Sequence, residues 1–428
     1  MNSFTLHFYS NLIPLFSGIA KMATPFHPKI RNFFKAREGL FEDLEKKISS
    51  AKLSDFKLWV HASSVGEFEQ ARPVISTLKK KYPDMTVFVS FLSDSGFNAC
   101  RNYADATAIF YLPADTRSNA RHLLSMIKPD ALLLMRYDFW PNHLLELKKQ
   151  GAKLILAAAV LQEHSQYFHP FLKSFYRSIF ALFDRIYTVS EKDAVAFRQY
   201  FNCSQAEAAG DPRFDQVVLR SRSTGKIGRL KELFANRMVI VAGSVWEKDE
   251  EVMINAWKKM AEKPSLILVP HEVHQQNMQR IYRNLENRSL PFMSFSNLDN
   301  SFDPDRHILV IDRIGFLAEL YSIASIAYVG GGFIDNVHNT IEPAVYGIPV
   351  ISGPNIQNSP EAEELVETGG AFVIDNAEQL YTILTNLVLD PSRRINAGKL
   401  AGKFVEERTG GTAKIVSGIE SLMPAFPV

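Results

Sequence analysis

A glutamate follows the first β-rich run of the chain, at a position suited to acid–base chemistry. Glu67 comes after a predicted strand at 57–61 and begins a stretch whose apolar residues recur at helical spacing. A carboxylate exposed at the start of a helix can accept a proton from a hydroxyl group, and we expect Gly66 to permit the tight turn into that helix. The alternative is that Glu67 only caps the helix, whose dipole stabilises a negative charge there.

A glycine-rich loop follows a later predicted strand at 326–329. The three glycines at 330–332 would let a ligand approach the backbone closely, and a helix expected to begin near Thr340 would point its free N–H groups at an anion. The loop matches neither a P-loop nor a GxGxxG fingerprint, so a glycine turn without a ligand is the alternative. Glu342 on the same helix can accept hydrogen bonds from two ribose hydroxyls, or it can simply cap the helix.

Three further loops place polar residues after strands. Arg213 lies at the expected junction between the two domains, whereas Ser244 and His271 follow predicted strands at 238–242 and 265–269. Arg213 and His271 are able to pair with a phosphate or a sugar carboxylate. Each residue alone is a weak signal, because surface arginine and histidine residues usually have no specific role.

The elements that must position these residues alternate as short β-rich runs and amphipathic stretches, which is typical of parallel sheets covered by helices. In the first half we expect strands at 57–61, 86–91, 108–112, 131–135, 153–157 and 185–189. In the second half we expect strands at 238–242, 265–269, 291–295, 307–311, 326–329, 349–351 and 371–374. Open α/β sheets bind ligands beyond the carboxyl ends of their strands, so two such sheets facing each other would form a cleft between them.

Composition supports two folded domains and excludes several classes of protein. A chain of 428 residues with 46% hydrophobic and 22% charged residues is too long for one ordinary core and has the composition of a globular protein. The two cysteines have no CxxC spacing, which predicts neither a disulfide framework nor a zinc site. A net charge of +2 gives no indication of a nucleic-acid partner.

The N-terminal segment is basic and rich in aromatic residues. Residues 1–37 contain five Lys and Arg residues and no Asp or Glu, and the apolar part is interrupted by polar residues and a proline before it reaches the length of a membrane span. This pattern favours a helix lying in the membrane interface on anionic lipid. A buried structural helix and a cleaved signal peptide are the alternatives, although residues 1–5 contain no Lys or Arg, unlike a signal peptide.

The segments that carry these residues resemble, in their order, the 3-deoxy-D-manno-octulosonic acid (Kdo) transferases of lipopolysaccharide assembly. The similar segments are HASSVGEFEQARPVISTL from His61, SFLSDSGFNA from Ser90, YLPADTRSNARHLL from Tyr111, DFWPNHLLEL from Asp138, AGDPRFDQV from Ala209, VAGSVWEKDEE from Val241, LVPHEVHQ from Leu268 and GGGFIDNVHNTIEPAVYGIPVISGP from Gly330. The resemblance spans nearly the whole chain, and its collective specificity is high.

The resemblance implies an α/β fold of the GT-B type, with two Rossmann-like domains whose parallel sheets face each other across a cleft. It also implies inverting transfer of Kdo from CMP-Kdo to a lipid A precursor, without a metal or cofactor, with Glu67 as the general base. We expect a membrane-associating segment at 1–40, an acceptor domain at 41–215, a linker at 216–235, a donor domain at 236–405, and a C-terminal helix at 406–428 that packs back towards the acceptor domain.

The same resemblance assigns residues to the two substrates. The positions that match donor-binding segments are Arg213, Ser244, His271, Gly331, Gly332, Asn339 and Glu342. The positions expected to contact the acceptor are Ser63, Ser64, Gly66, Arg136 and Asp138. Two segments depart from the commoner pattern: Arg136 stands where many members have a carboxylate, and His271-Glu272 replaces Arg-His of a Pro-Arg-His-Pro segment, so the acceptor contacts and the cation supplied there are less well defined.

These expectations place the protein on the cytoplasmic face of the bacterial inner membrane, as a peripheral or monotopic enzyme whose partners are CMP-Kdo, the lipid acceptor and an anionic membrane surface. Two other enzyme classes share the expected architecture: a membrane-associated transferase that uses a UDP-sugar, and a nucleotide-sugar epimerase. The basic N-terminal segment argues against the epimerase, because a soluble substrate gives no reason for a membrane anchor. A non-catalytic scaffold fits poorly with so many polar residues placed after strands.

Overall fold

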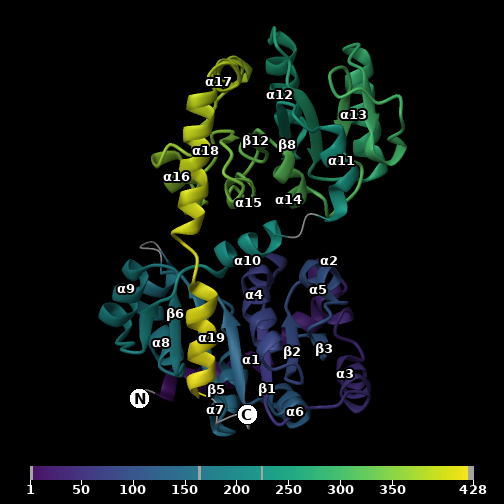
Figure 1. The fold of residues 1–428 in the computed structure, drawn as a ribbon. Helices are drawn as coiled ribbons and strands as arrows, with labels where there is room; N and C mark the ends of the chain where they lie inside the picture. The colour runs from purple at the N-terminus through teal and green to yellow at the C-terminus, as the bar shows by residue number, and fades with distance from the viewer. Residues whose placement is uncertain (1–2, 162–164, 223–224, 423–428) are drawn as a thin grey trace. The chain divides into compact units, whose positions relative to one another are not determined.

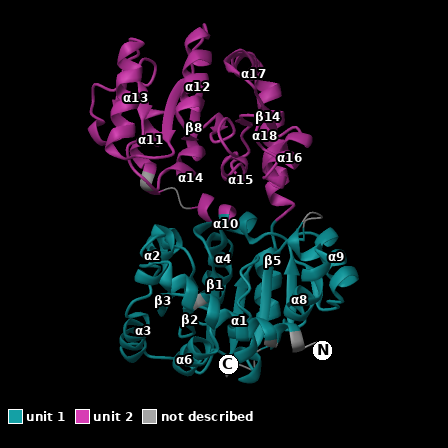
Figure 2. Ribbon diagram, turned by 180° about the vertical axis from the view of Figure 1, so that it is seen from behind, with its two compact units in different colours: residues 1–216, 409–428 teal, residues 217–408 magenta. Residues whose placement is uncertain are grey.

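The computed structural model describes residues 3–161, 165–222 and 225–422 of the chain (Figure 1). Two compact units are present: residues 1–216 with 409–428, and residues 217–408 (Figure 2). The boundary between them falls inside helix α10 (Pro212–Ser221), and the predicted linker at 216–235 also contains the short helices η2 (Gly225–Ile227) and α11 (Gly228–Leu233).

The first unit is built on one parallel sheet of seven strands. Their order across the sheet is β3-β2-β1-β4-β5-β6-β7. The strands are β1 (Lys57–Ala62), β2 (Thr86–Phe91), β3 (Ala108–Tyr111), β4 (Ala131–Met135), β5 (Lys153–Ala159), β6 (Arg185–Thr188) and β7 (Ala206–Ala208). Six match predicted strands to within two residues at each end, and β7 is additional.

Helices cover both faces of this sheet. They are α1 (Ser3–Met22), α2 (Pro28–Lys35), α3 (Leu40–Ser49), α4 (Val65–Lys81), α5 (Asp94–Cys100), α6 (Arg117–Ile127), α7 (Pro141–Lys149), η1 (Gln166–Phe168), α8 (Pro170–Phe180), α9 (Glu191–Phe201) and α19 (Gly411–Leu422). Neighbouring strand residues point to opposite faces: Trp59 joins one core cluster, whereas Leu58 and Val60 join the other. Such two-sided burial is why the strands read as nearly continuous apolar runs.

The C-terminal helix belongs to the first unit. Ile415 and Ile419 of α19, drawn in yellow in Figure 1, are fully buried in the same core cluster as Val74 and Leu78 of α4. Residues more than 300 positions apart in the chain are thereby joined in one core, so the first unit depends on the C-terminus for its packing.

The second unit contains another parallel sheet of seven strands, in the order β10-β11-β9-β8-β12-β13-β14. The strands are β8 (Val239–Val245), β9 (Ser265–Pro270), β10 (Phe292–Ser294), β11 (Ile308–Val310), β12 (Ile326–Val329), β13 (Val350–Ser352) and β14 (Ala371–Val373). The helices are α12 (Glu247–Lys259), α13 (Gln275–Asn287), η3 (Phe295–Asn297), α14 (Leu317–Leu320), η4 (Tyr321–Ile323), α15 (Ile341–Ala344), α16 (Pro360–Glu367), α17 (Ala377–Leu389) and α18 (Pro391–Glu406). All seven strands predicted for this half are present.

Each sheet has a central switch point, where the connections that leave two neighbouring strands run in opposite directions across the sheet. This switch lies between β1 and β4 in the first unit and between β8 and β12 in the second. In open α/β sheets, ligands bind beside the carboxyl ends of the two strands that flank this point. The strand order therefore selects the loops after these four strands from all the loops of the chain. Among the described helices, none has the length and apolarity needed to cross a membrane.

Candidate functional site

Glu67 is the third residue of α4, which begins directly after β1. Its Oε2 atom accepts a hydrogen bond of 2.5 Å from the backbone N–H of Ser63, and the Ser64 hydroxyl accepts one of 3.4 Å from the Glu67 backbone. The side chain is half-buried. These bonds cap the helix and also orient the carboxylate, so the capping and the chemical interpretations of Glu67 describe the same geometry.

The expected tight turn at Gly66 was wrong, whereas its expected contact with the acceptor stays a prediction. This glycine lies inside the first turn of α4, and no positive φ angle is required there. A Cβ atom added at Gly66 would meet only the Ser64 hydroxyl, at 3.9 Å. Gly66 is exposed, so what it provides is an open surface beside Glu67 rather than a turn.

The loop after β4 presents a carboxylate that is held from the neighbouring strand β1. Asp138 Oδ2 lies 3.0 Å from Nε2 of His61, and Nδ1 of His61 lies 2.8 Å from the Ser90 hydroxyl. Because the carboxylate only accepts, the His61 Nε2 atom carries a proton and donates to Asp138. His61 is buried, whereas Asp138 retains 20% of its side-chain exposure. A buried histidine thus fixes the direction of a carboxylate that a ligand can reach.

A second cluster of the first unit joins two arginines to one buried carboxylate. Asp211, with 2% exposure, accepts hydrogen bonds from Gln70 Nε2 at 2.9 Å and from Arg213 Nε at 2.8 Å. Arg136 Nη2 lies 3.8 Å from Asp211, and Arg136 Nε donates to Gln70 Oε1 at 2.9 Å. Asp211 thereby holds Arg136 and Arg213 beside each other, and guanidinium groups are well suited to bind an anionic ligand group.

This cluster places Arg213, expected on the donor side, with Arg136, expected on the acceptor side. Arg136 has a φ angle of 60°, a backbone conformation that is uncommon for a non-glycine residue. Sequence interpretation did not assign roles to His61, Gln70 or Asp211. The sequence signal that could have identified His61 is a polar residue within an otherwise apolar strand, here β1.

In the second unit, the ends of β8 and β12 are packed against each other. Ser244 has a φ angle of 51°, and a Cβ atom at Gly330 would lie 2.3 Å from the Ser244 carbonyl oxygen. Gly331 has a φ angle of +94°, and a Cβ atom there would lie 2.3 Å from the Asn336 carbonyl oxygen. These glycines are required by the packing of the protein's own backbone, and the expected approach of a ligand to this loop stays a prediction.

Gly332 is also constrained by the protein's own backbone, and the helix that follows the loop is short. A Cβ atom at Gly332 would lie 2.8 Å from the backbone of Gly353. The helix expected near Thr340 is α15, which has only four residues, so its backbone dipole is too short to provide the expected anion site. The structure therefore gives the glycine-rich loop a packing role.

A buried carboxylate links this loop to the start of α12. Asp249 is fully buried and accepts hydrogen bonds from the backbone N–H groups of Trp246 and Gly331, both at 3.0 Å. It also accepts one of 2.6 Å from the Tyr328 hydroxyl. Burial and this carboxylate raise the pKa of Tyr328 well above its ordinary value, so the phenol stays protonated. Asp249 thus binds β12 and its loop to the end of β8.

Three aromatic rings meet at this point. His271, after β9, stacks on Trp246 with ring centroids 4.5 Å apart and on His338 at 4.4 Å. The Trp246 Nε1–H group donates to His338 Nε2 at 3.1 Å. Burial, with a smaller effect from His271, lowers the pKa of His338 from 6.5 to about 4. His338 is therefore a neutral acceptor at physiological pH.

Asn339 and Glu342 are the remaining residues of the second unit that we expected to bind the donor. Asn339 is exposed, and its Oδ1 atom accepts from the Ile341 backbone at 3.2 Å. Glu342 forms an ion pair of 3.4 Å with Arg220 of α10 and lines a small hollow that also contains Tyr346. The structure thus brings together Ser244, Gly331 and His271 with the unpredicted Trp246, His338 and Asp249. Glu342 is not one of these six residues, and its ion pair is with Arg220.

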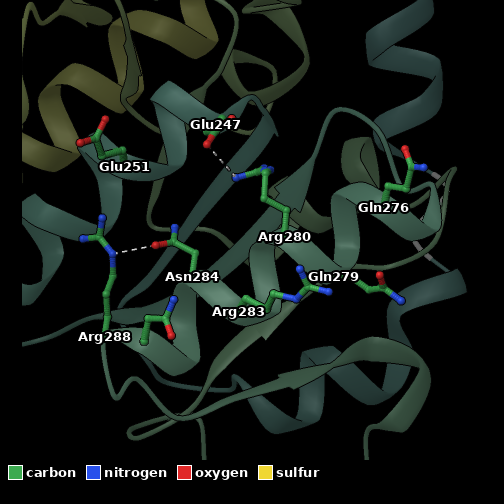
Figure 3. Close-up of a pocket in the computed structure, with 9 residues that line it drawn as sticks. Glu247, Glu251, Gln276, Gln279, Arg280, Arg283, Asn284 and Arg288 are labelled. Atoms are coloured by element: carbon green, nitrogen blue, oxygen red, sulfur yellow. Dashed lines mark hydrogen bonds and ion pairs between the residues drawn. The ribbon is translucent and has the colours of Figure 1, made fainter.

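A larger open groove, of about 610 Å³, lies between α12 and α13 (Figure 3). It contains none of the predicted site residues. Two of its arginines bind residues of α12: Arg280 donates to the buried Glu250 at 2.8 Å and lies 3.9 Å from Glu247, and Arg288 donates to Asn255 at 2.5 Å. These contacts hold α13 against α12.

Comparison with known proteins identifies the family. Residues 33–216 match the family model for 3-deoxy-D-manno-octulosonic-acid transferase (kdotransferase). A 3-deoxy-D-manno-octulosonic acid transferase of Rickettsia felis is 30% identical over 359 residues, which cover 82% of this chain and 75% of that protein. A bifunctional glycosyltransferase/methyltransferase of Fusobacterium nucleatum is 27% identical over 88% of this chain, and the match spans 59% of that longer protein.

Solved structures agree on the fold. A glycosyltransferase of Rickettsia africae matches with a TM-score of 0.57 and 14% identity, over 86% of this chain and 98% of its own. The UDP-GlcNAc 2-epimerase of Neisseria meningitidis, bound to UDP-GlcNAc, matches with a TM-score of 0.59 and 15% identity, over 86% of this chain and 100% of its own. The fold is GT-B, and the chain belongs to the 3-deoxy-D-manno-octulosonic acid (Kdo) transferase family of glycosyltransferases.

Proposed function

We propose that the protein transfers Kdo from CMP-Kdo to a hydroxyl group of a lipid A precursor, with inversion at the anomeric carbon. In this reaction Glu67 removes the proton of the acceptor hydroxyl as its oxygen attacks the anomeric carbon and CMP leaves. Family membership supports the class of sugar transferred. The main support for the role of Glu67 is the hydrogen bond of 2.5 Å that its carboxylate accepts from the Ser63 N–H. This bond holds the carboxylate beside the carboxyl end of β1, at the switch point of the first sheet, where α/β proteins bind their ligands.

The charged residues of the first unit support an anionic substrate. Arg136 and Arg213 lie against the buried Asp211, and guanidinium groups are well suited to bind an anion. Asp138 is held by His61 where it can accept a hydrogen bond from an acceptor hydroxyl. CMP carries a single phosphate, whose charge a few cationic and N–H groups can offset. We therefore propose that no metal ion is needed, and transfer in excess EDTA at the rate without EDTA is the expected result.

The test of the base is Glu67→Gln, which keeps the size of the side chain and removes its basicity. We expect the rate of transfer to fall by about 10²–10⁴-fold, because a positioned base typically contributes that much. Glu69→Gln is the matched control, since Glu69 lies two residues further along α4 and pairs with Arg72 at 2.9 Å. Activity of Glu67→Gln within about threefold of the control would exclude the proposed role.

The choice of donor is tested separately. Wild-type protein is incubated with a lipid A precursor and either radiolabelled CMP-Kdo or radiolabelled UDP-sugars. The solved epimerase of similar fold shows that the fold itself accommodates UDP-sugars in that protein. Transfer from a UDP-sugar, or epimerisation of it, with none from CMP-Kdo would overturn the proposed donor.

We propose that the protein acts at the cytoplasmic face of the bacterial inner membrane and lies on its surface. Helix α1 is anchored to the first unit by the buried Leu6 and by a hydrogen bond of 3.0 Å from Tyr9 to Asp115. Leu15, Phe16 and Ile19, in the second half of α1, are exposed by 55–61%. The basic residues nearby are Lys21, Lys29, Arg31 and Lys35. An apolar face bordered by cations is suited to anionic lipid.

The membrane surface is tested with point substitutions, because deleting residues 1–20 would also remove the buried Leu6. We expect Phe16→Ser with Ile19→Ser to reduce sedimentation with vesicles of anionic phospholipid while CMP binding persists. The control is Leu389→Ser, which removes an equally exposed apolar side chain, 63% exposed, from α17 of the second unit. Equal sedimentation of the two variants would contradict the proposed surface.

A further inference from the structure

A row of hydrogen bonds crosses one face of the first sheet and ends at an exposed carboxylate. The Trp59 indole N–H donates to the Ser90 hydroxyl at 2.8 Å, and the same hydroxyl lies 2.8 Å from Nδ1 of His61. Nε2 of His61 lies 3.0 Å from Oδ2 of Asp138. The first three side chains are buried, whereas Asp138 keeps 20% of its side-chain exposure. Only the last member of the row therefore reaches the surface.

Strand register brings these side chains together. Trp59 and His61 are two residues apart in β1, so their side chains point to the same face of the sheet. His61 is the direct partner of Ser90 in β2 and of Leu134 in β4, the strand that leads into the Asp138 loop. His61 thus lies between β2 and β4 near the carboxyl end of β1, next to the switch point of the sheet.

The direction of each bond follows from the groups that can only donate or only accept. The Trp59 indole N–H only donates, so Ser90 accepts there, and the Asp138 carboxylate only accepts, so Nε2 of His61 carries a proton. Within the described residues, Nδ1 of His61 is the acceptor recorded for the Ser90 hydrogen. A proton on Nδ1 would leave this buried hydroxyl hydrogen unpaired, which is unfavourable. Every partner is satisfied when Ser90 donates to Nδ1, and all donors then point towards Asp138.

The loop leaves the direction of the Asp138 carboxylate to His61. The Phe139 N–H donates to the Tyr137 carbonyl at 3.0 Å, which closes a three-residue turn with Asp138 at its centre. The Phe139 ring packs edge-on against Phe180, with ring centroids 5.3 Å apart. The backbone of the turn is thereby held, and the bond from His61 to Oδ2 orients the side chain. Oδ1 of Asp138 accepts no hydrogen bond from the described part of the chain.

We propose that Trp59, Ser90 and His61 are positioning residues for the transfer reaction, which turn Oδ1 of Asp138 towards a hydroxyl group of the acceptor. The inference rests on the proposed function in taking a hydroxyl-bearing acceptor as the ligand. It goes beyond that function in giving a role to two buried residues that touch no ligand, Trp59 and Ser90, and in stating the direction of every bond between them. A carboxylate that is oriented in advance loses less side-chain freedom on binding, so the row lowers the KM for the acceptor.

Ser90→Ala breaks the row at its centre and leaves Asp138 in place. We expect the KM for the lipid acceptor to rise about 3- to 10-fold, while kcat and CMP affinity stay within about twofold, because the lost bond acts only through the direction of Asp138. An unchanged KM would overturn the inference. A fall in kcat at constant KM would also overturn it, since that result would give Ser90 a different role.

A double-mutant cycle tests whether Ser90 acts through His61. His61→Phe alone is expected to raise the acceptor KM about tenfold. If Ser90 acts only by holding this ring, then adding Ser90→Ala to His61→Phe should change the KM by less than about twofold. Two effects that multiply would mean that the residues act independently, and the proposed row would be wrong.

The matched control is Thr86→Val, in the same strand as Ser90 but at its other end. Thr86 is also buried, and its hydroxyl oxygen accepts a hydrogen bond of 2.8 Å from the Ser54 backbone. The control removes a buried hydroxyl group without touching the row, so its acceptor KM should equal that of wild type. Circular dichroism spectra verify that both variants fold. An equal rise in KM for Thr86→Val would show that lost stability, not lost positioning, causes the effect.

The direction of the row is tested on the wild-type protein without any substrate. In ¹⁵N spectra of histidine-labelled protein at neutral pH, the His61 signals are those lost in His61→Phe. We expect Nε2 to be protonated and Nδ1 to be an unprotonated acceptor whose signal shifts in Ser90→Ala. A proton on Nδ1 in the wild type would overturn the inference.

These measurements let the inference and the proposed function fail separately. If the wild type transfers sugar from a UDP-sugar and none from CMP-Kdo, the proposed donor is wrong, and the acceptor KM values of the cycle are measured with that UDP-sugar. If Kdo transfer from CMP-Kdo proceeds and Ser90→Ala leaves the acceptor KM unchanged, the proposed donor stands and the positioning role of Ser90 is wrong.

Discussion

The neutral His338 gives the second unit a dependence on pH whose size follows from its pKa. Burial lowers the pKa of this ring from 6.5 to about 4 in the folded protein. The unfolded chain binds the proton more readily, so the contribution to stability is fully present above pH 6.5 and is lost as pH falls towards 4. Linkage over that interval gives a loss of about 2 kcal/mol at pH 5, and partial exposure of the ring reduces the expected loss to about 1–2 kcal/mol.

The perturbation is His338→Gln, whose amide accepts the Trp246 hydrogen bond but does not titrate. Urea unfolding of both proteins is followed by tryptophan fluorescence between pH 7 and pH 5. Because every other titrating group is shared, the difference between the two curves reports position 338 alone. With a typical slope of about 2 kcal/mol per M urea, the midpoint of wild type should fall by about 0.5–1 M more than that of His338→Gln.

A two-unit chain can unfold in more than one step, and the affected transition is expected to be that of the second unit. Parallel decreases of the two midpoints from pH 7 to pH 5 would refute the reasoning, since they would mean that folding does not hold His338 neutral. A larger decrease for His338→Gln would reverse the predicted sign and lead to the same conclusion.

Two further predictions concern the switch points of the sheets. Gly331→Ala should destabilise the protein by more than about 2 kcal/mol, because its Cβ atom would lie 2.3 Å from a backbone oxygen, whereas Gly315→Ala should cost only about 1 kcal/mol, since its φ angle of +92° is similar and its surroundings are open. Thermal unfolding checks this, and equal losses would show that the close contact is unimportant. His61→Phe should raise the KM for the lipid acceptor about tenfold without changing CMP affinity, because Asp138 loses its donor at 3.0 Å; an unchanged KM in steady-state assays would exclude a role for this pair in acceptor binding.

The sequence determined the secondary structure because burial leaves a local pattern. Strands such as β4, with all five residues buried, read as apolar runs between helical stretches. The strand that was missed, β7, has three residues with an exposed Glu207 at its centre and lies at the sheet edge, so too little of it is buried to give a pattern. The sequence also placed Glu67 correctly at the start of the helix that follows β1, whereas Ser244, predicted to follow a strand, lies within β8.

The local sequence pattern was misleading at glycines, because a glycine can be required for several different structural reasons. A glycine is expected at a turn, beside a ligand or beside another backbone segment, and the sequence does not distinguish these causes. Gly66 proved to be an ordinary helical residue with open space beside it, whereas Gly331 proved to be fixed by its own φ angle and by a neighbouring carbonyl. Likewise, the sequence predicted a helix near Thr340 but not that this helix, α15, has only four residues.

Only the tertiary structure decided which polar residues meet. His61 and Asp138 are 77 positions apart, Trp246 and His338 are 92 apart, and Gln70 and Asp211 are 141 apart. The first two pairs form because strand order places β1 beside β4 and β8 beside β12. That order results from the packing of whole sheets and helices, not from any contiguous stretch of residues. The sequence therefore located the ends of the strands, and the fold determined which of those ends share a site.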